Sequence, residues 1–246
     1  MIPLRDNVPR VHPPLAVVLL IVINALVFFY EVGLDPLSKA QLFHLYGVVP
    51  LRFLNPEWAN HIGYPDSSVI PFFSYMFLHS GWLHLILNMW MLWIFGDNIE
   101  DVTGHGWFLL FYALCGLAAV GAHILSDASS SVPVVGASGA VAGVMGAYMV
   151  LYPHGKVQVL VPIFFFPLFF RVPSVLFLGI WAGSQFLTGV LTIANGAAQP
   201  VAVWAHVGGF VAGIALIMVF RGRDRCYYCY NPDFRDYSEP TERNQK

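Results

Sequence analysis

Apolar runs of about twenty residues recur along this chain of 246 residues, and they limit its possible folds more than any other feature. Hydrophobic residues make up 57% of the sequence and charged residues only 11%, whereas soluble domains carry about 25% charged residues. Because a helix of about 20 apolar residues crosses a bilayer, the runs predict an all-α integral membrane protein. The length suits one bundle of about six such helices with their connections.

Six membrane spans are predicted, at residues 15–32, 82–95, 107–125, 134–151, 175–193 and 201–220. The second span has an alternative start near Phe73, because residues 76–78 are apolar as well. Between spans one and two lies a long segment, 33–72, rich in proline, asparagine and aromatic residues. The segment 157–172 is apolar, but Pro162 and Pro167 interrupt it, so it is too short to span. Residues 157–159 and 169–172 are instead expected to form a short hairpin at the membrane interface.

The basic residues predict the orientation of the spans. An even number of spans places both termini on one side, and that side also holds the connection between spans four and five. It carries Arg5, Arg10, Lys156, Arg171, Arg221, Arg223 and Arg225, whereas the opposite side has only Lys39 and Arg52. The positive-inside rule then places both termini in the cytoplasm. We therefore expect a cytoplasmic segment (1–14), a six-helix membrane domain (15–220) and a polar cytoplasmic tail (221–246) that is poorly ordered. The absence of a transit-like N-terminus favours a bacterial plasma membrane.

Charge and cysteine content exclude some classes of protein. A formal net charge of −2 argues against a nucleic-acid partner, and three cysteines do not make a disulfide framework. Cys226-x-x-Cys229 follows the last span on the predicted cytoplasmic side, where a disulfide is not expected. Alone it supplies at most half of a zinc site, so we interpret it as incidental.

A serine lies where the fourth helix is expected to begin, in Gly136-Ala137-Ser138-Gly139. The preceding stretch is loop-like, so Ser138 is predicted at a helix N-terminus below the membrane surface. Irregular backbone at that depth is tolerated where protein buries it or where it lines a watery cavity. Unpaired N–H groups at a helix start suit an oxyanion next to a serine nucleophile. The alternative is that Ser138 is only a small packing residue or a helix cap.

A histidine opens the sixth span, in Ala205-His206-Val207-Gly208-Gly209. His206, Gly209 and Gly213 share one helix face, and the fourth span has glycines at 139, 143 and 146. Glycine faces let membrane helices approach closely, so packing of these two helices would bring His206 to Ser138. An ionisable residue within a span indicates function by default. The alternative is a histidine that binds a backbone carbonyl of a neighbouring helix.

His84 and Asn88 are four residues apart and share one face of the second span. Polar groups there need partners or a function, and such donors stabilise a tetrahedral oxyanion. The alternatives are an interhelical hydrogen-bond pair, or a zinc site made by His79, His84 and His206. The zinc hypothesis lacks the His-Glu-x-x-His signature and a nearby carboxylate.

Taken together, these blocks resemble the rhomboid family of intramembrane serine proteases. The matching residues are His84-x-x-x-Asn88, Gly96-x-x-x-Glu100-x-x-x-Gly104, Gly136-Ala137-Ser138-Gly139 and Ala205-His206-Val207-Gly208-Gly209. The resemblance implies a six-helix core with a site that opens to the outside, and a serine–histidine dyad without a carboxylate. The fourth and sixth spans indeed contain no Asp or Glu. Asp97 lies nine residues after Asn88, which is about 13 Å further along a helix.

The sequence departs from patterns seen in some rhomboids at two positions. An adjacent Trp-Arg pair in the first loop is absent, since the chain has Arg52 and Trp58 apart from each other. An aromatic residue four positions after the serine, which would pack on the histidine, is replaced by Ala142. The anchor of the first loop and the group that holds His206 are therefore left open.

We expect an intramembrane serine endopeptidase that cleaves transmembrane segments of single-span membrane proteins. Ser138 would be the nucleophile and His206 the general base, with Asn88 and His84 as oxyanion donors. Water would enter along His79, His84 and the serines at 129–131. Apart from substrates, the only partner expected is the lipid bilayer, and no metal or other cofactor is expected. Two alternatives stay open: a pseudoprotease that binds transmembrane segments, and a small-solute transporter, which would need mid-span charges that are scarce here.

Overall fold

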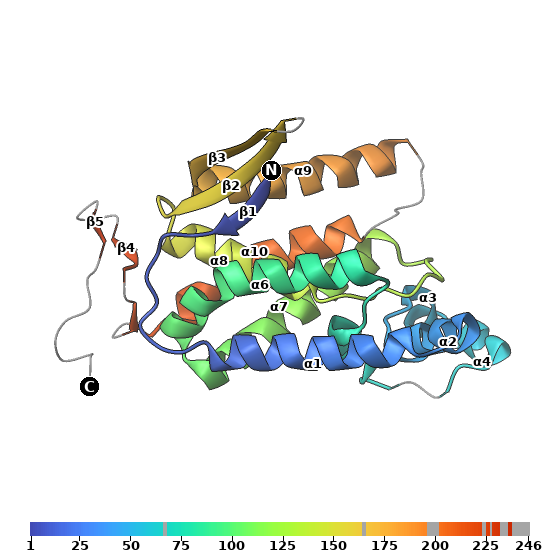
Figure 1. Ribbon diagram of the computed structural model, residues 1–246. Helices are drawn as coiled ribbons and strands as arrows, with labels where there is room; N and C mark the ends of the chain where they lie inside the picture. Colours follow the sequence, from blue (N-terminus) through green and yellow to red (C-terminus); the bar gives the residue numbers. More distant parts are fainter. Residues whose placement is uncertain are drawn as a thin grey trace.

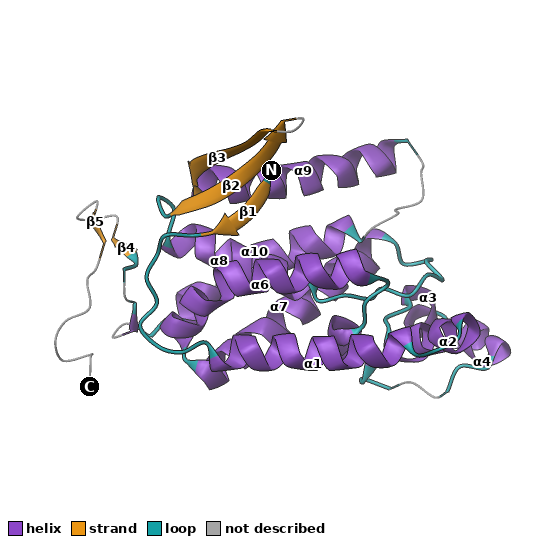
Figure 2. Cartoon of the chain, in the orientation of Figure 1, coloured by secondary structure: helices purple, strands orange, loops and turns teal. Residues whose placement is uncertain are grey.

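Long helices make up most of the chain, as the computed structural model shows; β1 to β3 lie beside the left half of the helices, and β4 and β5 lie beyond their left end (Figures 1 and 2). The structure describes residues 1–65, 68–163, 166–195, 202–222, 225–226, 228–231 and 236–237. The long helices are α1 (Leu15–Val32), α6 (Trp82–Thr103), α7 (His105–Ser126), α8 (Ser138–Leu151), α9 (Ser174–Ala194) and α10 (Val203–Phe220). α10 packs against α7, α8 and α9, while α1 packs against α6 and α7.

Four of the six predicted spans agree with these helices within two residues at each end, whereas the fourth, predicted from residue 134, begins as a helix only at Ser138. Val201, the predicted start of the sixth span, lies outside the described residues. The prediction for the second span was wrong at its C-terminal end, since α6 continues beyond Phe95 to Thr103. This last part of α6 carries acidic residues, which the sequence placed outside the membrane helix. The helix continues because those carboxylates find backbone N–H partners.

Two of the carboxylates on α6 fasten the start of the chain to the bundle. Glu100 is only 2% exposed and accepts hydrogen bonds from the N–H groups of Ala16 and Val17, each at 2.8 Å. These are first-turn N–H groups of α1, which have no partner within their own helix. Asp101 accepts from the N–H groups of Val11 (2.5 Å) and His12 (2.8 Å). The Gly96–Glu100–Gly104 pattern therefore has a structural role: it anchors α1.

The first loop contains short helices that sequence analysis did not identify. They are α2 (Pro36–Tyr46), α3 (Pro50–Leu54), α4 (Pro56–Ile62), α5 (Pro71–Ser74) and the 3₁₀ turn η1 (Tyr75–Phe77). Each of the four α-helices begins with proline, the residue preferred at the first helical position because its missing N–H is not needed there. The prolines that suggested a loop were therefore helix-start signals. α2, α3 and α4 lie at the opposite end of the bundle from the strands (Figure 1).

Arg52 anchors this first loop, which answers the question left by the missing Trp-Arg pair. Its side chain is only 5% exposed. One guanidinium nitrogen, Nη1, donates to the carbonyls of His44 (3.2 Å) and Leu45 (3.1 Å) at the end of α2. The guanidinium also lies 4.8 Å from the ring centroid of Tyr64. A basic group at a helix C-terminus satisfies carbonyls that would otherwise be unpaired.

Loss of the Glu100 carboxylate is expected to destabilise the fold without touching the dyad. Glu100→Ala leaves two buried N–H groups of α1 without acceptors, so the free energy of unfolding should fall by about 2–3 kcal/mol. Denaturant titration in detergent measures this. Glu57→Ala, at an exposed position on α4, serves as the control and should change stability by less than about 0.5 kcal/mol. Equal stability of the two variants would contradict the anchoring role.

The predicted hairpin is confirmed and is longer than expected. β2 (Lys156–Ile163) and β3 (Phe166–Pro173) are antiparallel, with Val157 opposite Val172. A strand that sequence analysis missed, β1 (Ile2–Arg5), pairs with the other edge of β2. The side chains of β3 from 166 to 171 are exposed on both faces of the strand and are mostly apolar, which is compatible with contact with lipid. The location of the hairpin at the interface stays a prediction.

Among the residues that the structure describes, four helices are long and apolar enough to cross a membrane: α1, α7, α9 and α10. α8 is apolar but has only 14 residues, and the hydropathy of α6 is lowered by polar residues such as His84, Asn88 and Asp97. The chain is therefore a mostly helical integral membrane protein. The count of six spans is not confirmed by these criteria.

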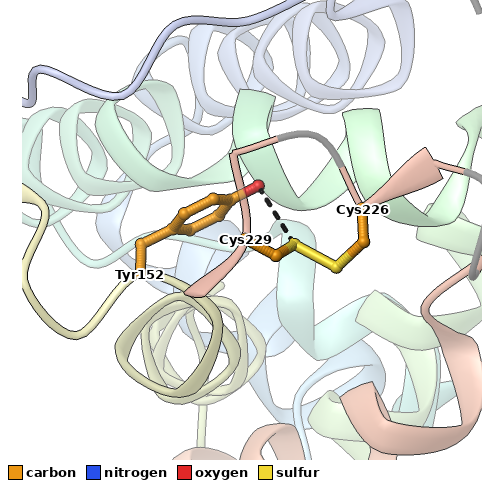
Figure 3. Close-up of a disulfide and its surroundings, with 3 residues drawn as sticks. All are labelled: Tyr152, Cys226 and Cys229. Carbon is orange, nitrogen blue, oxygen red and sulfur yellow. Dashed lines mark hydrogen bonds between the residues drawn. A yellow bond between two sulfur atoms is a disulfide. The ribbon is translucent and has the colours of Figure 1, made fainter. Parts of the chain in front are cut away.

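The expectation for the C-terminal cysteines was wrong. Cys226 and Cys229 form a disulfide, and the Tyr152 hydroxyl lies 3.9 Å from the Cys229 sulfur (Figure 3). The two Cα atoms are 5.4 Å apart, within bonding range for a disulfide. The expectation was based on the reducing conditions of the cytoplasm and did not consider how close Cys226 and Cys229 lie to each other. Arg223 and most of the tail predicted to be poorly ordered lie outside the described residues, although β4 (Tyr230–Asn231) pairs with β5 (Asp236–Tyr237).

Candidate active site

Ser138 is the first residue of α8, at the point where an irregular segment enters the bundle. Gly136, two residues earlier, has φ +124°, a conformation that side-chain-bearing residues rarely adopt. Its N–H donates to the carbonyl of Tyr75 at 2.8 Å, and the Tyr75 hydroxyl donates to the carbonyl of Gly116 at 2.7 Å. The predicted loop followed by a helix is therefore confirmed. The first N–H groups of α8, beginning with that of Ser138, have no acceptor within their own helix.

Glycines bring α8 and α10 into direct backbone contact. A methyl group added to Gly209 would overlap the carbonyl oxygen of Gly139, and one added to Gly213 would overlap the carbonyl oxygen of Gly143. Such close approach is what small residues permit between membrane helices. The prediction that matching glycine faces join these two helices is confirmed.

This packing places the serine and the histidine within hydrogen-bond distance. His206 Nε2 lies 2.8 Å from Ser138 Oγ, the contact expected between a nucleophile and its base. The other ring nitrogen, Nδ1, lies 2.8 Å from Oε1 of Gln185 on α9. Trp181, one turn before Gln185, places its ring centroid 6.0 Å from that of His206, with 38° between the planes. An aromatic side chain thus does pack beside the histidine, although it comes from α9 and not from position 142.

The polar face of α6 lies against the segment that leads to Ser138. The ring of His84 packs on Gly136 so closely that a Cβ there would lie 2.6 Å from His84 Nε2. Its other nitrogen, Nδ1, lies 3.1 Å from Ser80 Oγ. Asn88 is 6% exposed and its Nδ2 lies 3.1 Å from Nε2 of His79. Burial, with a smaller contribution from the His84 ring, lowers the pKa of His79 to about 4, so His79 is neutral and can accept this hydrogen bond.

A cavity of about 760 Å³ opens beside the dyad. Ser138, His206 and His84 line it, together with Ser130 from the loop before α8. Of the residues predicted to line the path of water, His84 and Ser130 line this cavity. The prediction was wrong for His79, which is fully buried, and Ser129 and Ser131 are not among the lining residues either. Polar groups on one wall of an otherwise apolar cavity are typical of a ligand site.

Sequence analysis missed three side chains beside the dyad. They are Trp181 and Gln185 on α9, and His123 on α7, which lines the cavity. A signal was present in each case. Trp181 and Gln185 are four residues apart on a predicted span, and His123 is an ionisable residue near the end of another. Only the packing of α7 and α9 against α10 shows that Trp181 and Gln185 contact His206 and that His123 lines the same cavity.

The zinc hypothesis receives no support from the described part of the chain. No group of three or more His, Cys, Asp or Glu side chains there is arranged to hold a metal ion. His79 and His84 do stack edge to face, with ring centroids 5.0 Å apart, but the nearest partner of His206 Nε2 is the Ser138 hydroxyl.

Comparison with known proteins gives one family. The model described as Rhomboid domain matches residues 66–223 of this chain. A relative from Saccharomyces cerevisiae, "Rhomboid protein 1, mitochondrial", is 31% identical over 212 residues, which are 83% of this chain and 53% of that protein. "Rhomboid protease GluP" from Bacillus subtilis is 40% identical over 72 residues, 29% of this chain and 14% of that protein.

A third relative, "Presenilin-associated rhomboid-like protein, mitochondrial" from Bos taurus, is 28% identical over 109 residues, 43% of this chain and 28% of that protein. The chain therefore spans about half the length of the yeast relative and less of the other two.

Proposed function

Because the chain belongs to the rhomboid family, we propose that it is an intramembrane serine endopeptidase that cleaves transmembrane segments of other membrane proteins. The observation that carries the proposal is the 2.8 Å contact between Ser138 Oγ and His206 Nε2 beside a cavity. A structural serine in a membrane helix has no need of a histidine on a neighbouring helix, nor of open space beside both.

The proposed reaction begins when a substrate peptide carbonyl reaches Ser138. His206 Nε2 removes the hydroxyl proton, and Oγ attacks the carbonyl carbon. The tetrahedral intermediate collapses, the amine leaves with the proton from His206, and an ester remains on Ser138. Water then attacks this ester with His206 again acting as base. A substrate helix must unwind locally for this, since its carbonyls are otherwise hydrogen-bonded within the helix.

The negative charge on the intermediate requires donors near Ser138. Its own backbone N–H, at the N-terminus of α8, is one. The Asn88 amide has two N–H donors, of which one binds His79, so the second remains for the oxyanion. His84 presents Nε2 toward the Gly136 segment; when the Ser80 hydroxyl donates to Nδ1, Nε2 carries the ring proton. We therefore assign Asn88 and His84 to the oxyanion site.

Removal of these donors should slow the reaction without changing substrate binding much. Asn88→Ala is expected to lower kcat by about 100- to 1,000-fold, because an oxyanion donor acts mainly in the transition state. His84→Ala should have a similar effect. Steady-state kinetics with purified protein in vesicles measures both. A variant that raises KM and leaves kcat intact would show that its side chain binds substrate and does not stabilise the oxyanion.

The membrane topology is part of the proposal. We propose that α1, α6, α7, α8, α9 and α10 all cross the bilayer, and that residues 15–220 form one domain. In Figure 1, β1 to β3 lie over the left half of the helices, beside the start of α9, and β4 and β5 lie beyond the left end. Arg5, Lys156 and Arg171 lie on those strands, so the positive-inside rule favours a cytoplasmic location for this end and for both termini. A bacterial plasma membrane stays a prediction, since one named relative is bacterial and two are mitochondrial.

The second candidate function is binding of transmembrane segments without cleavage. Reconstituted vesicles that contain a single-span reporter protein distinguish the two. Proteolysis predicts two fragments whose new ends lie in or next to the reporter's transmembrane segment, and no fragments with Ser138→Ala. Co-purification of an intact reporter with the wild-type protein, without fragments, would instead support the binding function.

A further inference from the structure

The imidazole of His206 is held from both sides by two different helices. Nε2 faces Ser138 Oγ on α8 and Nδ1 faces Gln185 Oε1 on α9, each at 2.8 Å. A base that takes a proton from Ser138 must have an unprotonated Nε2, so the ring proton of the neutral form must be on Nδ1. That proton needs an acceptor, and an amide oxygen is one.

We propose that Gln185 is a positioning residue for the reaction, an inference that rests on the proposed serine protease function. It accepts the Nδ1 proton of His206, which selects the tautomer with a free Nε2 and fixes the direction in which that nitrogen points. An amide serves this role in the Cys-His-Asn arrangement of papain-like proteases, where the third group carries no charge. The chain thus has a Ser138–His206–Gln185 sequence of hydrogen bonds in place of an isolated dyad.

Trp181 completes the support from the same helix. It precedes Gln185 by four residues, so both side chains lie on one face of α9. Its ring lies 6.0 Å from the rings of both His206 and Phe210, which closes one side of the imidazole. Rotation of the His206 side chain away from Ser138 would break the bond to Gln185 and the ring contact together.

No carboxylate takes the place of the amide in the described site. The other titratable side chains that line the cavity beside His206 are His84 from α6, His123 from α7, Asp127 and Tyr75. The partner of His206 Nδ1 is the Gln185 amide oxygen. A neutral acceptor stabilises the imidazolium less than a carboxylate does, so exchanging the amide for a carboxylate should favour the protonated ring.

Two substitutions of Gln185 test the proposal kinetically. Gln185→Ala should lower kcat about 10- to 100-fold with KM unchanged within about twofold, because a misplaced base costs rate and not binding. Gln185→Glu keeps an acceptor and should retain most of kcat. In that variant the acidic limb of the kcat/KM profile should move to higher pH, because the carboxylate stabilises the protonated ring of His206. Thr188→Ala, an exposed position on α9, is the matched control and should behave as wild type.

A readout independent of catalysis separates this inference from the protease function. The ¹⁵N chemical shifts of labelled histidine report the tautomer, and subtraction of the His206→Gln spectrum identifies His206. The wild-type protein should show a proton on Nδ1, and Gln185→Ala should lose this preference. An unchanged tautomer in that variant, with wild-type kcat, would overturn the role of Gln185 even if cleavage depends on Ser138. A changed tautomer in a protein that cleaves nothing would uphold it while the protease proposal fails.

Discussion

Replacement of Ser138 by alanine is expected to reduce cleavage of a membrane-anchored reporter by about 10⁴-fold or more. The variant loses the only atom that forms the covalent intermediate, whereas the cavity, the oxyanion donors and the helix packing stay in place. His206→Ala should have a comparable effect, because an unassisted serine hydroxyl is a weak nucleophile. Residual activity should come from the oxyanion site and from substrate binding. Quantification of the fragments over time in vesicles measures these losses.

The combination of both changes gives a sharper result than either alone. Residues that act as one unit have strongly non-additive effects, so the double variant should be no slower than the single ones within a few-fold. Ser184→Ala and His61→Ala, both at exposed positions, are controls of the same residue types and should cleave normally. A joint role in one proton transfer would be contradicted if the double variant lost rate by the product of the two single factors. It would also be contradicted if either single variant still cleaved the reporter.

Gly213→Ala is expected to destabilise the protein strongly. The new methyl group would overlap the carbonyl oxygen of Gly143, which is backbone and has no rotamer to move into. α8 and α10 would have to separate, so we expect a loss of about 3 kcal/mol or more in the free energy of unfolding. Since the same contact sets the distance between Ser138 and His206, activity should fall even below the unfolding temperature. Thermal unfolding in detergent and the reporter assay measure the two effects.

Gly183→Ala on α9 is the matched control for this change. A Cβ there meets no atom within 4 Å, so the control should keep its stability or gain up to about 1 kcal/mol from higher helix propensity. Similar unfolding temperatures for the two glycine variants would show that α8 and α10 are not held together by this contact.

Sequence patterns predicted those parts of the site that depend on the spacing of residues along a single helix. Spacing alone placed His84 and Asn88 on one face of α6, and glycine spacing on α8 and α10 predicted the contact that brings Ser138 to His206. The start of α8 at Ser138 followed from the loop-like residues before it. The spacing of residues along a helix determines which side chains share a face, and this can be read from one sequence.

Features that depend on a distant partner could not be predicted in the same way. Gln185 and Trp181 become part of the site only because α9 packs against α10. The end of α6 was missed because Glu100 is acceptable inside the fold once the N-terminus of α1 supplies its N–H groups. Strand β1 was missed for a similar reason: its four residues gain order from β2, more than 150 residues later.

Covalent labelling by a fluorophosphonate probes the reactivity of Ser138 itself, because it needs no knowledge of the natural substrate. Ser138 Oγ should displace fluoride from phosphorus, and mass spectrometry should find the adduct on the peptide that contains Ser138. We expect this label in the wild-type protein, and its loss in His206→Ala and in Ser138→Ala. A folded wild-type protein without the adduct, or equal labelling of Ser138→Ala, would contradict the assignment of Ser138 as an activated nucleophile.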